Sequence, residues 1–343
     1  MTIARRMRRC VGGMVPIWFP ESMSGRQMQD YLGRTLADAE LFIDPSRLLL
    51  VVDGCPQAEE PTRRAAAEMG ERAGFEPRMI VREENGGKGA AVCTGLRRLL
   101  EDDDVEALSI RDADGDHDIY DLPQLYRHFE TVREHSESDR IFVVGGRFSL
   151  TRPLGLARGE LERVLNRVTV DAVNAKLAPE GAAVDERFTA RYGEPADFQS
   201  GYKLYSREAA EVVIEALEKA DAGMPEHRVM HWAVEFIPTV ELLLRGFIPA
   251  ALHRVTWDGQ PQTTFDGSNI ARAYSKQIAW LFERLDLPAG VAMTLLDRAL
   301  AECEYITADG GADEIATLRR QVVERCYPDR SSLPPPGRGE IFI

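Results

Sequence analysis

The segment with the clearest capacity for chemistry is "RDADGDHDIYDLP", residues 111–123, which places Asp112, Asp114, Asp116 and Asp118 at alternate positions. Carboxylates at this density repel one another, so we expect a cation to neutralise them. Two carboxylates one residue apart point the same way from an extended backbone. Asp112 and Asp114 would then share one Mg²⁺ or Mn²⁺ ion, whose remaining positions take water and phosphate oxygens. We expect Asp116 to be a third ligand.

The same run invites comparison with a calcium-binding loop, which needs Gly at position 6 and Glu at position 12. A loop that starts at Asp112 has His117 and Pro123 at these positions, and a start at Asp114 fails at position 6 as well. The run also follows an apolar segment, 107–110, that is typical of a buried strand rather than of a helix. These features disfavour a calcium-binding module.

The remaining aspartates of the run have a local interpretation. Asp118 and Asp121 precede a segment in which we expect a helix to begin near Leu122. Aspartate is among the residues preferred at helix N-termini, because its carboxylate accepts hydrogen bonds from free backbone N–H groups. We therefore expect Asp118 and Asp121 to be caps.

Alternating apolar and amphipathic segments predict the elements that position this run. We expect strands at 11–19, 47–54, 76–84 and 105–114, and helices at 24–39, 59–74 and 87–102. With the helix expected near Leu122 these segments form four strand–helix units in succession, which imply an α/β fold with a mostly parallel sheet and helices on both faces. In such sheets ligands bind beyond the carboxyl ends of the strands.

The second half of the chain adds fewer strands. We expect a buried strand at 141–148, a helix at 155–178, and a short strand that runs into a helix capped near Ser206. From about residue 267 the pattern is helical only. The three predicted helices there span 269–286, 288–303 and 312–326.

Composition excludes several classes of protein. The 343 residues carry a net charge of −14, which argues against nucleic acid as a partner because phosphate binding needs a basic surface. The five cysteines are scattered, which fits a reducing cytoplasm without a disulfide framework. The basic N-terminus precedes an apolar run that is short and lacks a cleavage site, so we interpret this run as the first strand rather than as part of a signal peptide. The most apolar segment, 229–252, is too charged to be an integral membrane segment.

Six motifs in order resemble glycosyltransferases of the GT-A fold, most closely the family-two branch similar to dolichyl-phosphate mannose synthase. The motifs are "MVPIWFPES", "LLLVVDG", "ENGGKGAAVCTGL", "RDADGDHDIYDLPQLY", "VVGGRF" and "DFQSGYKLYSREA", and the resemblance covers roughly residues 11–255. It implies a GT-A domain over 1–266, with a nucleotide-binding half at about 11–118 and an acceptor half at about 140–266. A helical extension, 267–327, and a Pro-rich tail, 328–343, complete the chain.

The resemblance also implies roles for individual residues. It implies donor contacts from Pro16, Glu21, Asp53, Asn85, Lys88, Asp112 and Arg147. Asp53 would contact the base or ribose, and Lys88 at the start of a helix would meet phosphate. Asp112 and Asp114 would hold the metal, with Asp116 in place of a family glutamine. His253, beside Arg254 at the end of an apolar run, is a further candidate for the metal.

The implied reaction is transfer of a sugar from a UDP- or GDP-linked donor to an unidentified, soluble acceptor, more consistent with inversion than with retention. An inverting enzyme needs a base for an acceptor hydroxyl, and the candidates are Glu235 and Asp197. Glu241 competes with Glu235 for the family's late acidic position. We expect a helix to begin at Pro238, so that Glu235 lies in the loop before it and Glu241 within it. We favour Glu235. The C-terminal helices are a possible homodimer surface.

A nucleotidyltransferase acting on a sugar phosphate is the alternative from another class. Enzymes of that kind carry a glycine-rich loop with Arg and Lys after the first strand. Here the corresponding loop is "WFPESMSG", which contains no basic residue. This absence counts against the alternative.

Overall fold

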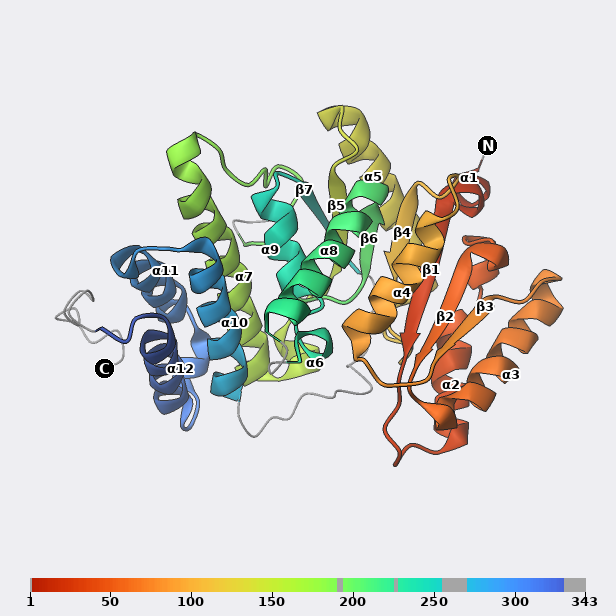
Figure 1. Ribbon diagram of the computed structural model, residues 1–343, viewed down its shortest axis with the longest axis horizontal. Coiled ribbons are helices and arrows are strands. Elements are labelled where there is room, and N and C mark those ends of the chain that lie inside the picture. The colour runs from red at the N-terminus through yellow and green to blue at the C-terminus, as the bar shows by residue number, and fades with distance from the viewer. Residues whose placement is uncertain (1, 190–193, 225–227, 255–269, 330–343) are drawn as a thin grey trace.

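The computed structural model describes residues 2–189, 194–224, 228–254 and 270–329 (Figure 1). Within these ranges one sheet holds seven strands in the order β3-β2-β1-β4-β6-β5-β7. The strands are β1 Val11–Ile17, β2 Leu48–Asp53, β3 Arg78–Arg82, β4 Ala107–Ile110, β5 Ile141–Gly146, β6 Lys203–Ser206 and β7 Ile248–His253. β6 runs antiparallel to both of its neighbours, and the other pairings are parallel. The predicted α/β class with a mostly parallel sheet is confirmed.

Side chains of successive strand residues enter two different hydrophobic clusters. In β2, Leu48, Leu50 and Val52 belong to one cluster, and Leu49 and Val51 belong to the other. This follows from the two-residue period of a strand, which turns neighbouring side chains to opposite faces. A sheet that is apolar on both faces must be covered on both.

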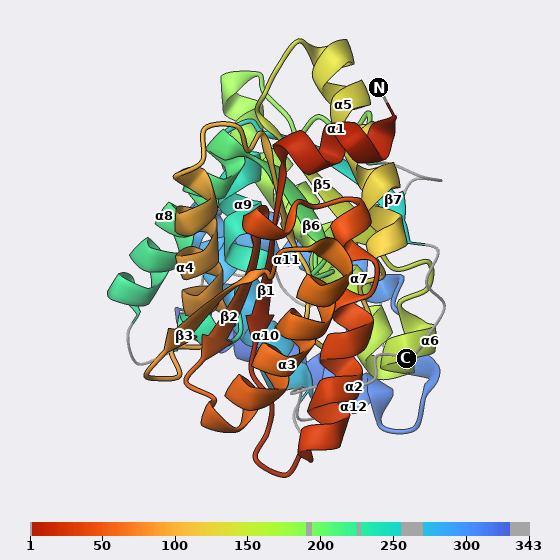
Figure 2. The same ribbon diagram turned by 90° about the vertical axis from the view of Figure 1, so that its right-hand side faces the viewer.

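Helices cover the two faces, as Figure 2 shows with α4 and α8 on one side of the sheet and α2 on the other. The first face carries α1 Ile3–Cys10, α2 Gly25–Leu36, α3 Pro56–Ala73 and α5 Leu122–Ser136. The second carries α4 Lys88–Leu100, α7 Leu156–Leu177, α8 Arg207–Gly223 and α9 Phe236–Leu244. The short helix α6 Thr151–Leu154 precedes α7. None of the described helices is long and apolar enough to cross a membrane.

The C-terminal helices α10 Ile270–Leu285, α11 Ala289–Ala301 and α12 Gly311–Cys326 lie where the sequence predicts them, within three residues at each end. They pack beside α7 at the blue end of the chain in Figure 1, and their apolar side chains join the same cluster as α4 and α9. Trp280 of α10 meets Phe236 of α9 edge-on, with ring centroids 5.6 Å apart. The extension therefore shares its core with the sheet. The predicted boundary at 266 lies outside the described residues.

The first strand begins at Val11 as predicted, and the residues before it form helix α1, with Met7 and Cys10 buried against the sheet domain and its arginines exposed. Two local predictions are wrong. The fourth strand ends at Ile110, so the chain leaves the sheet before the first aspartate. Helix α9 begins at Phe236 rather than at Pro238, which occupies its first turn, where a proline costs no hydrogen bond.

Candidate active site

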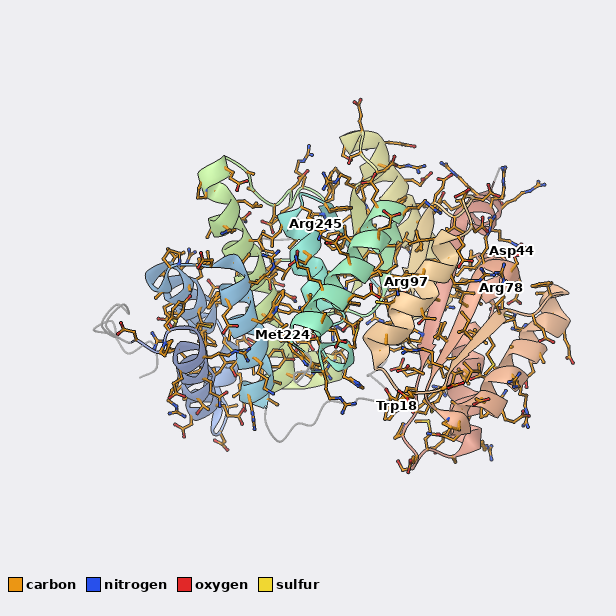
Figure 3. All side chains as sticks on the ribbon, viewed as in Figure 1. Trp18, Asp44, Arg78, Arg97, Met224 and Arg245 are labelled. Atoms are coloured by element: carbon orange, nitrogen blue, oxygen red, sulfur yellow. The ribbon has the colours of Figure 1, made fainter. Side chains whose placement is uncertain are left out.

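The candidate site lies at the carboxyl ends of the central strands. Asp53 is the last residue of β2, and Asp112 follows the end of β4 by two residues. Trp18, half-exposed, lies directly beyond the end of β1 at the lower rim of the molecule in Figure 3. β1 pairs with both β2 and β4, so these strand ends are neighbours. This is the edge at which parallel α/β sheets bind ligands.

Lys88 joins two carboxylates from distant parts of the chain. Its Nζ lies 2.7 Å from Oδ1 of Asp112 and 2.6 Å from Oε1 of Glu235. Burial opposes the charge on Lys88, but Asp112 and Glu235 outweigh it and raise the pKa of Lys88 above its usual range. The three side chains keep between a fifth and a third of their surface exposed, so a ligand can reach the cluster.

The glycines around Lys88 let another segment approach. A Cβ at Gly87 would lie 2.7 Å from the carbonyl oxygen of Met230, and one at Gly89 would lie 2.8 Å from the sulfur of Met230. Gly87 also has φ +88°, a conformation that favours glycine. The 3₁₀ turn Val229–His231 therefore packs directly on the start of α4, and it leads the chain to Glu235 four residues later.

Asp53 and Asn85 shape the turn before α4. Asp53 Oδ1 accepts a hydrogen bond from the Gly86 N–H at 3.2 Å and pairs with Arg82 at 3.0 Å. Asn85 Oδ1 accepts from the Gly87 N–H at 2.9 Å. The second carboxylate oxygen of Asp53 is buried and has no hydrogen-bond partner among the described residues. A buried oxygen without a donor is costly, and a ligand N–H or O–H would satisfy it.

The acidic run folds into a turn rather than continuing the strand. Gly115 has φ +78°, and Asp114 Oδ1 accepts a hydrogen bond from the Asp116 N–H at 3.1 Å. The extended alternation expected for Asp112 and Asp114 is therefore wrong. Asp118 caps the 3₁₀ turn Ile119–Asp121 as predicted, accepting from the Tyr120 N–H at 2.9 Å.

Asp121 does not behave as the second predicted cap. It occupies the position before α5, but its side chain makes no capping hydrogen bond to that helix within the described residues. The carboxyl group is buried with the residue at 5% exposure. The single-turn helix that Asp118 caps runs straight into α5, so the cap at Asp118 serves both elements.

Cations from distant parts of the chain compensate the charge repulsion expected within the run. Lys88 neutralises Asp112, and Arg254 approaches Asp116 Oδ2 at 3.2 Å. Asp114 has no such ion pair among the described residues. Burial, followed by the charge of Asp112, raises the pKa of Asp114 to about 7. Asp114 is therefore the carboxylate of this turn that most needs a further cation.

Three side chains hold three consecutive carbonyl groups of the turn. Arg254 donates to the carbonyl of Asp116 at 3.0 Å, and Arg111 donates to the carbonyl of His117 at 3.3 Å. The hydroxyl of Tyr202 donates to the carbonyl of Asp118 at 3.1 Å. Arg111, Tyr202 and Arg254 come from the ends of β4, β6 and β7. The turn is thus anchored from three strands before any ligand arrives.

His117 is a site residue that the sequence patterns did not single out for function. It is buried, its ring stacks on Tyr202 with centroids 5.0 Å apart, and its Nδ1 accepts the Asp112 N–H at 2.9 Å. Burial, with Arg254 and Lys88 nearby, holds the pKa of His117 well below its ordinary value. The neutral ring then carries its proton on Nε2, which faces the carboxylates of Asp112 and Asp116 at 3.9 and 4.0 Å. The sequence signal that could have identified His117 is its position between Asp116 and Asp118 in the alternating run.

Arg147 and Asp197 form a second, more enclosed cluster. Arg147 Nε and one terminal nitrogen contact the two carboxylate oxygens of Asp197 at 2.8 and 2.7 Å, and Arg147 also reaches Glu162 at 2.5 Å. Burial raises the pKa of Asp197, but Arg147 outweighs it, so the pKa lies below its ordinary value. A carboxylate held in this way is a poor proton acceptor. This geometry favours a supporting role for the pair.

The two glutamates that compete in the sequence lie in different surroundings. Glu235 stands at the start of α9 and contacts Lys88. Glu241, two turns further along the helix, is buried and binds Arg284 of α10 at 2.6 and 3.0 Å. Position on α9 therefore separates them, with Glu235 facing the Lys88 cluster and Glu241 facing the helical extension.

Three further predicted residues surround the site. Pro16 is buried within β1, and Glu21 is exposed in the turn that follows this strand. His253 is the last residue of β7, and its ring meets that of Phe148 edge-on at 5.4 Å. The roles implied for these residues stay predictions.

The metal prediction can be compared with the donor atoms present. Across the described part of the chain, no three His, Cys, Asp or Glu side chains are already arranged around a common point in the manner of a closed metal site. Mg²⁺ and Mn²⁺ bound with substrate phosphates need only one or two carboxylates, the rest being water and phosphate. Asp112 and Asp114 are two such oxygen donors, and burial together with the charge of Asp112 raises the pKa of Asp114, so the pair fits that requirement.

Comparison with known proteins adds little to this geometry. No family model matches the chain, and no curated protein does. Among solved structures, the chain is similar to residues 1–349 of TarS from S. aureus, with a TM-score of 0.39 and 11% sequence identity over 92% of this chain and 89% of that one. A likeness at this level leaves the function to be inferred from the residues of the site.

Proposed function

We propose that this protein is a metal-dependent glycosyltransferase of the GT-A type, which transfers a sugar from a nucleotide-diphosphate sugar with inversion at the anomeric carbon. The observation that carries the proposal is the contact of Lys88 with both Asp112 and Glu235. This contact supports the proposal because a cation suited to phosphate, a carboxylate suited to a metal ion and a candidate base would then act together at one edge of the sheet. The order of motifs that resemble family-two enzymes supports the same reaction.

The donor would lie along the ends of β2 and β4. The unpartnered oxygen of Asp53 suits a hydroxyl of the ribose or an N–H of the base. Lys88 and the first backbone N–H groups of α4 suit the diphosphate, because a helix N-terminus attracts anions. Asp112 and Asp114 would hold Mg²⁺ or Mn²⁺ beside it.

The reaction separates charge between the sugar and the departing diphosphate. A bound divalent ion would neutralise part of the charge that develops on the diphosphate. Lys88 stabilises the remainder, since it is already charged and partly desolvated. Arg254 and Arg147 are less available for this task, because Arg254 is paired with Asp116 and Arg147 with Asp197 and Glu162.

Glu235 is the better placed proton acceptor for an acceptor hydroxyl. Its carboxylate is partly exposed and points at Lys88, whereas the carboxylate of Asp197 is bound on both oxygens by Arg147. Removal of the hydroxyl proton raises the nucleophilicity of the attacking oxygen. An acceptor that is already a phosphate or carboxylate would not need this step.

The proposal is tested by incubating the protein with Mn²⁺ and a panel of UDP-, GDP- and dTDP-sugars. Thermal shift measures binding, and release of free nucleotide diphosphate measures slow donor hydrolysis. We expect one donor to stabilise the protein only when metal is present, and Lys88→Met to lose that effect. The absence of a response to every donor would exclude the proposed function. Release of inorganic pyrophosphate from a nucleoside triphosphate and a sugar phosphate would instead identify a nucleotidyltransferase.

A further inference from the structure

Lys203 is a buried lysine that the proposed chemistry does not use. It is the first residue of β6 and is 1% exposed. Tyr202 and Leu204 on either side belong to the cluster under α5, so the side chain of Lys203 is directed to the opposite face, where α4 and α9 lie. Its Nζ donates to the carbonyl of Phe198 at 2.9 Å and to the carbonyl of Ser200.

A lysine in this position carries an energetic cost. Among the described residues no carboxylate forms an ion pair with Lys203, although Glu235 and Asp197 are close enough to act on it through space. Burial is the larger influence and lowers the pKa of Lys203 to about 8. An apolar side chain of similar length would avoid this penalty. The two carbonyl contacts are therefore the feature that a lysine supplies and a methionine would not.

The turn 197–201, which Lys203 contacts, packs against the candidate site. Ser200 Oγ donates to the carbonyl of Gly145 at 2.6 Å, which ties the turn 197–201 to β5. A Cβ at Gly201 would lie 2.7 Å from Oδ2 of Asp112 and 3.0 Å from Nζ of Lys88. The backbone of Gly201 thus packs directly on the Asp112–Lys88 pair, and the position of the turn determines the space left for those two side chains.

We propose that Lys203 is a positioning residue: by holding the carbonyl groups of Phe198 and Ser200 it fixes the turn 197–201, and through Gly201 it keeps Asp112 and Lys88 in their binding geometry. The ligands concerned, a divalent ion and a nucleotide diphosphate, rest on the proposed function. The claim that Lys203 fixes the turn 197–201 is independent of the proposed function. Supporting residues of this kind typically change metal affinity by 10- to 100-fold.

The test compares Lys203→Met with Tyr205→Phe, a matched change on the same strand and the same face. Amide hydrogen exchange is measured over the turn 197–201 and over β5, and Mn²⁺ affinity is measured by electron paramagnetic resonance with and without UDP or GDP. We expect Lys203→Met to speed exchange in the turn at least tenfold, to leave β5 unchanged, and to weaken Mn²⁺ binding about tenfold. Tyr205→Phe should alter neither quantity.

Each outcome decides a separate point. Unchanged exchange in the turn of a folded Lys203→Met protein overturns the positioning role. Faster exchange with unchanged Mn²⁺ affinity overturns the link from the turn to Asp112. If Lys203→Met does not fold, amide exchange in the turn 197–201 of the wild-type protein is the deciding measurement. Exchange as fast as in an unstructured peptide would show that the turn is not held in place, which overturns the proposal. Failure of wild-type protein to bind any nucleotide or metal counts against the proposed function and leaves the exchange result valid.

Discussion

Glu235 and Lys88 are 147 positions apart in the chain, yet their side chains meet at 2.6 Å. The same ammonium group lies 2.7 Å from Asp112. A single lysine therefore connects the carboxylate proposed as the base with the carboxylate proposed to hold the metal. Any ligand that draws Lys88 toward a diphosphate changes the charge felt by both.

Glu235→Gln should lower kcat while the donor still binds. Gln keeps the size of the side chain but cannot accept a proton, and loss of a general base costs roughly 10²- to 10⁴-fold. Steady-state kinetics with the donor found in the panel, together with its dissociation constant, measure the effect.

Glu241→Gln is the matched control for this change, since it lies on the same helix. It loosens the contact with Arg284, whose side chain is 41% exposed, so we expect a loss of only about 1 kcal/mol of stability and an unchanged kcat. Equal losses of kcat in the two variants would contradict the assignment of Glu235.

Asp114→Asn should weaken Mn²⁺ binding by roughly 10- to 100-fold, because it removes a carboxylate that lies beside Asp112 without an ion pair of its own among the described residues. Isothermal titration with Mn²⁺ provides the measurement. Asp118→Asn is the control, since Asn also caps helical turns and the capping hydrogen bond to Tyr120 can be retained. Similar Mn²⁺ affinity for wild type and Asp114→Asn would move the metal site elsewhere.

Gly201→Ala should damage the site and spare the fold. The new methyl group would displace the ends of two flexible side chains, Asp112 and Lys88, and would press on the ring of His117 at 3.2 Å, but it would meet no backbone atom among its three nearest neighbours. We expect about a tenfold loss of metal and donor affinity with a change in stability below about 1 kcal/mol.

Gly33→Ala serves as the reference for that substitution. Gly33 lies inside α2, and a Cβ there meets nothing within 4 Å. This change should stabilise the protein by about 0.5–1 kcal/mol, because Gly is costly in a helix interior, and should leave both affinities unchanged. A Gly201→Ala protein that binds as tightly as this reference would refute the close packing.

Alkaline pH should destabilise the protein through its buried thiols. Burial, followed by the charge of Glu218, raises the pKa of Cys93 to about 12 from an ordinary value of 9.0. Above pH 9 the unfolded chain therefore releases this proton while the folded protein retains it. The free energy of unfolding must then fall as pH rises from 9 toward 12.

Between pH 7.5 and pH 10 the Cys93 thiol alone should account for about 1.4 kcal/mol of this loss. Urea unfolding of wild type and of Cys93→Ala at both pH values isolates the contribution, because other titrating groups cancel in the difference. Val92→Ala, a neighbouring core substitution without a titrating proton, should cost the same at both values. An identical pH dependence in wild type and Cys93→Ala would disprove the prediction.

The elements and their order could be predicted from the sequence because their signals are local. Strands such as Leu48–Asp53 are short apolar runs, and the helices between them show the helical period. The positions of Asp53, Lys88 and Asp112 at strand and helix ends follow from the same signals. A parallel sheet gathers the carboxyl ends of its strands, so the location of these three residues at one edge of the sheet was predictable.

Only the tertiary structure decided which charges meet. Arg254 reaches Asp116 across 138 positions of the chain, and Glu235 rather than Glu241 faces Lys88. The antiparallel course of β6, which directs Lys203 beneath the site, was equally out of reach. Periodicity and turn residues report on a few neighbouring positions, whereas strand order and the pairing of buried charges are determined by the free energy of packing the whole chain.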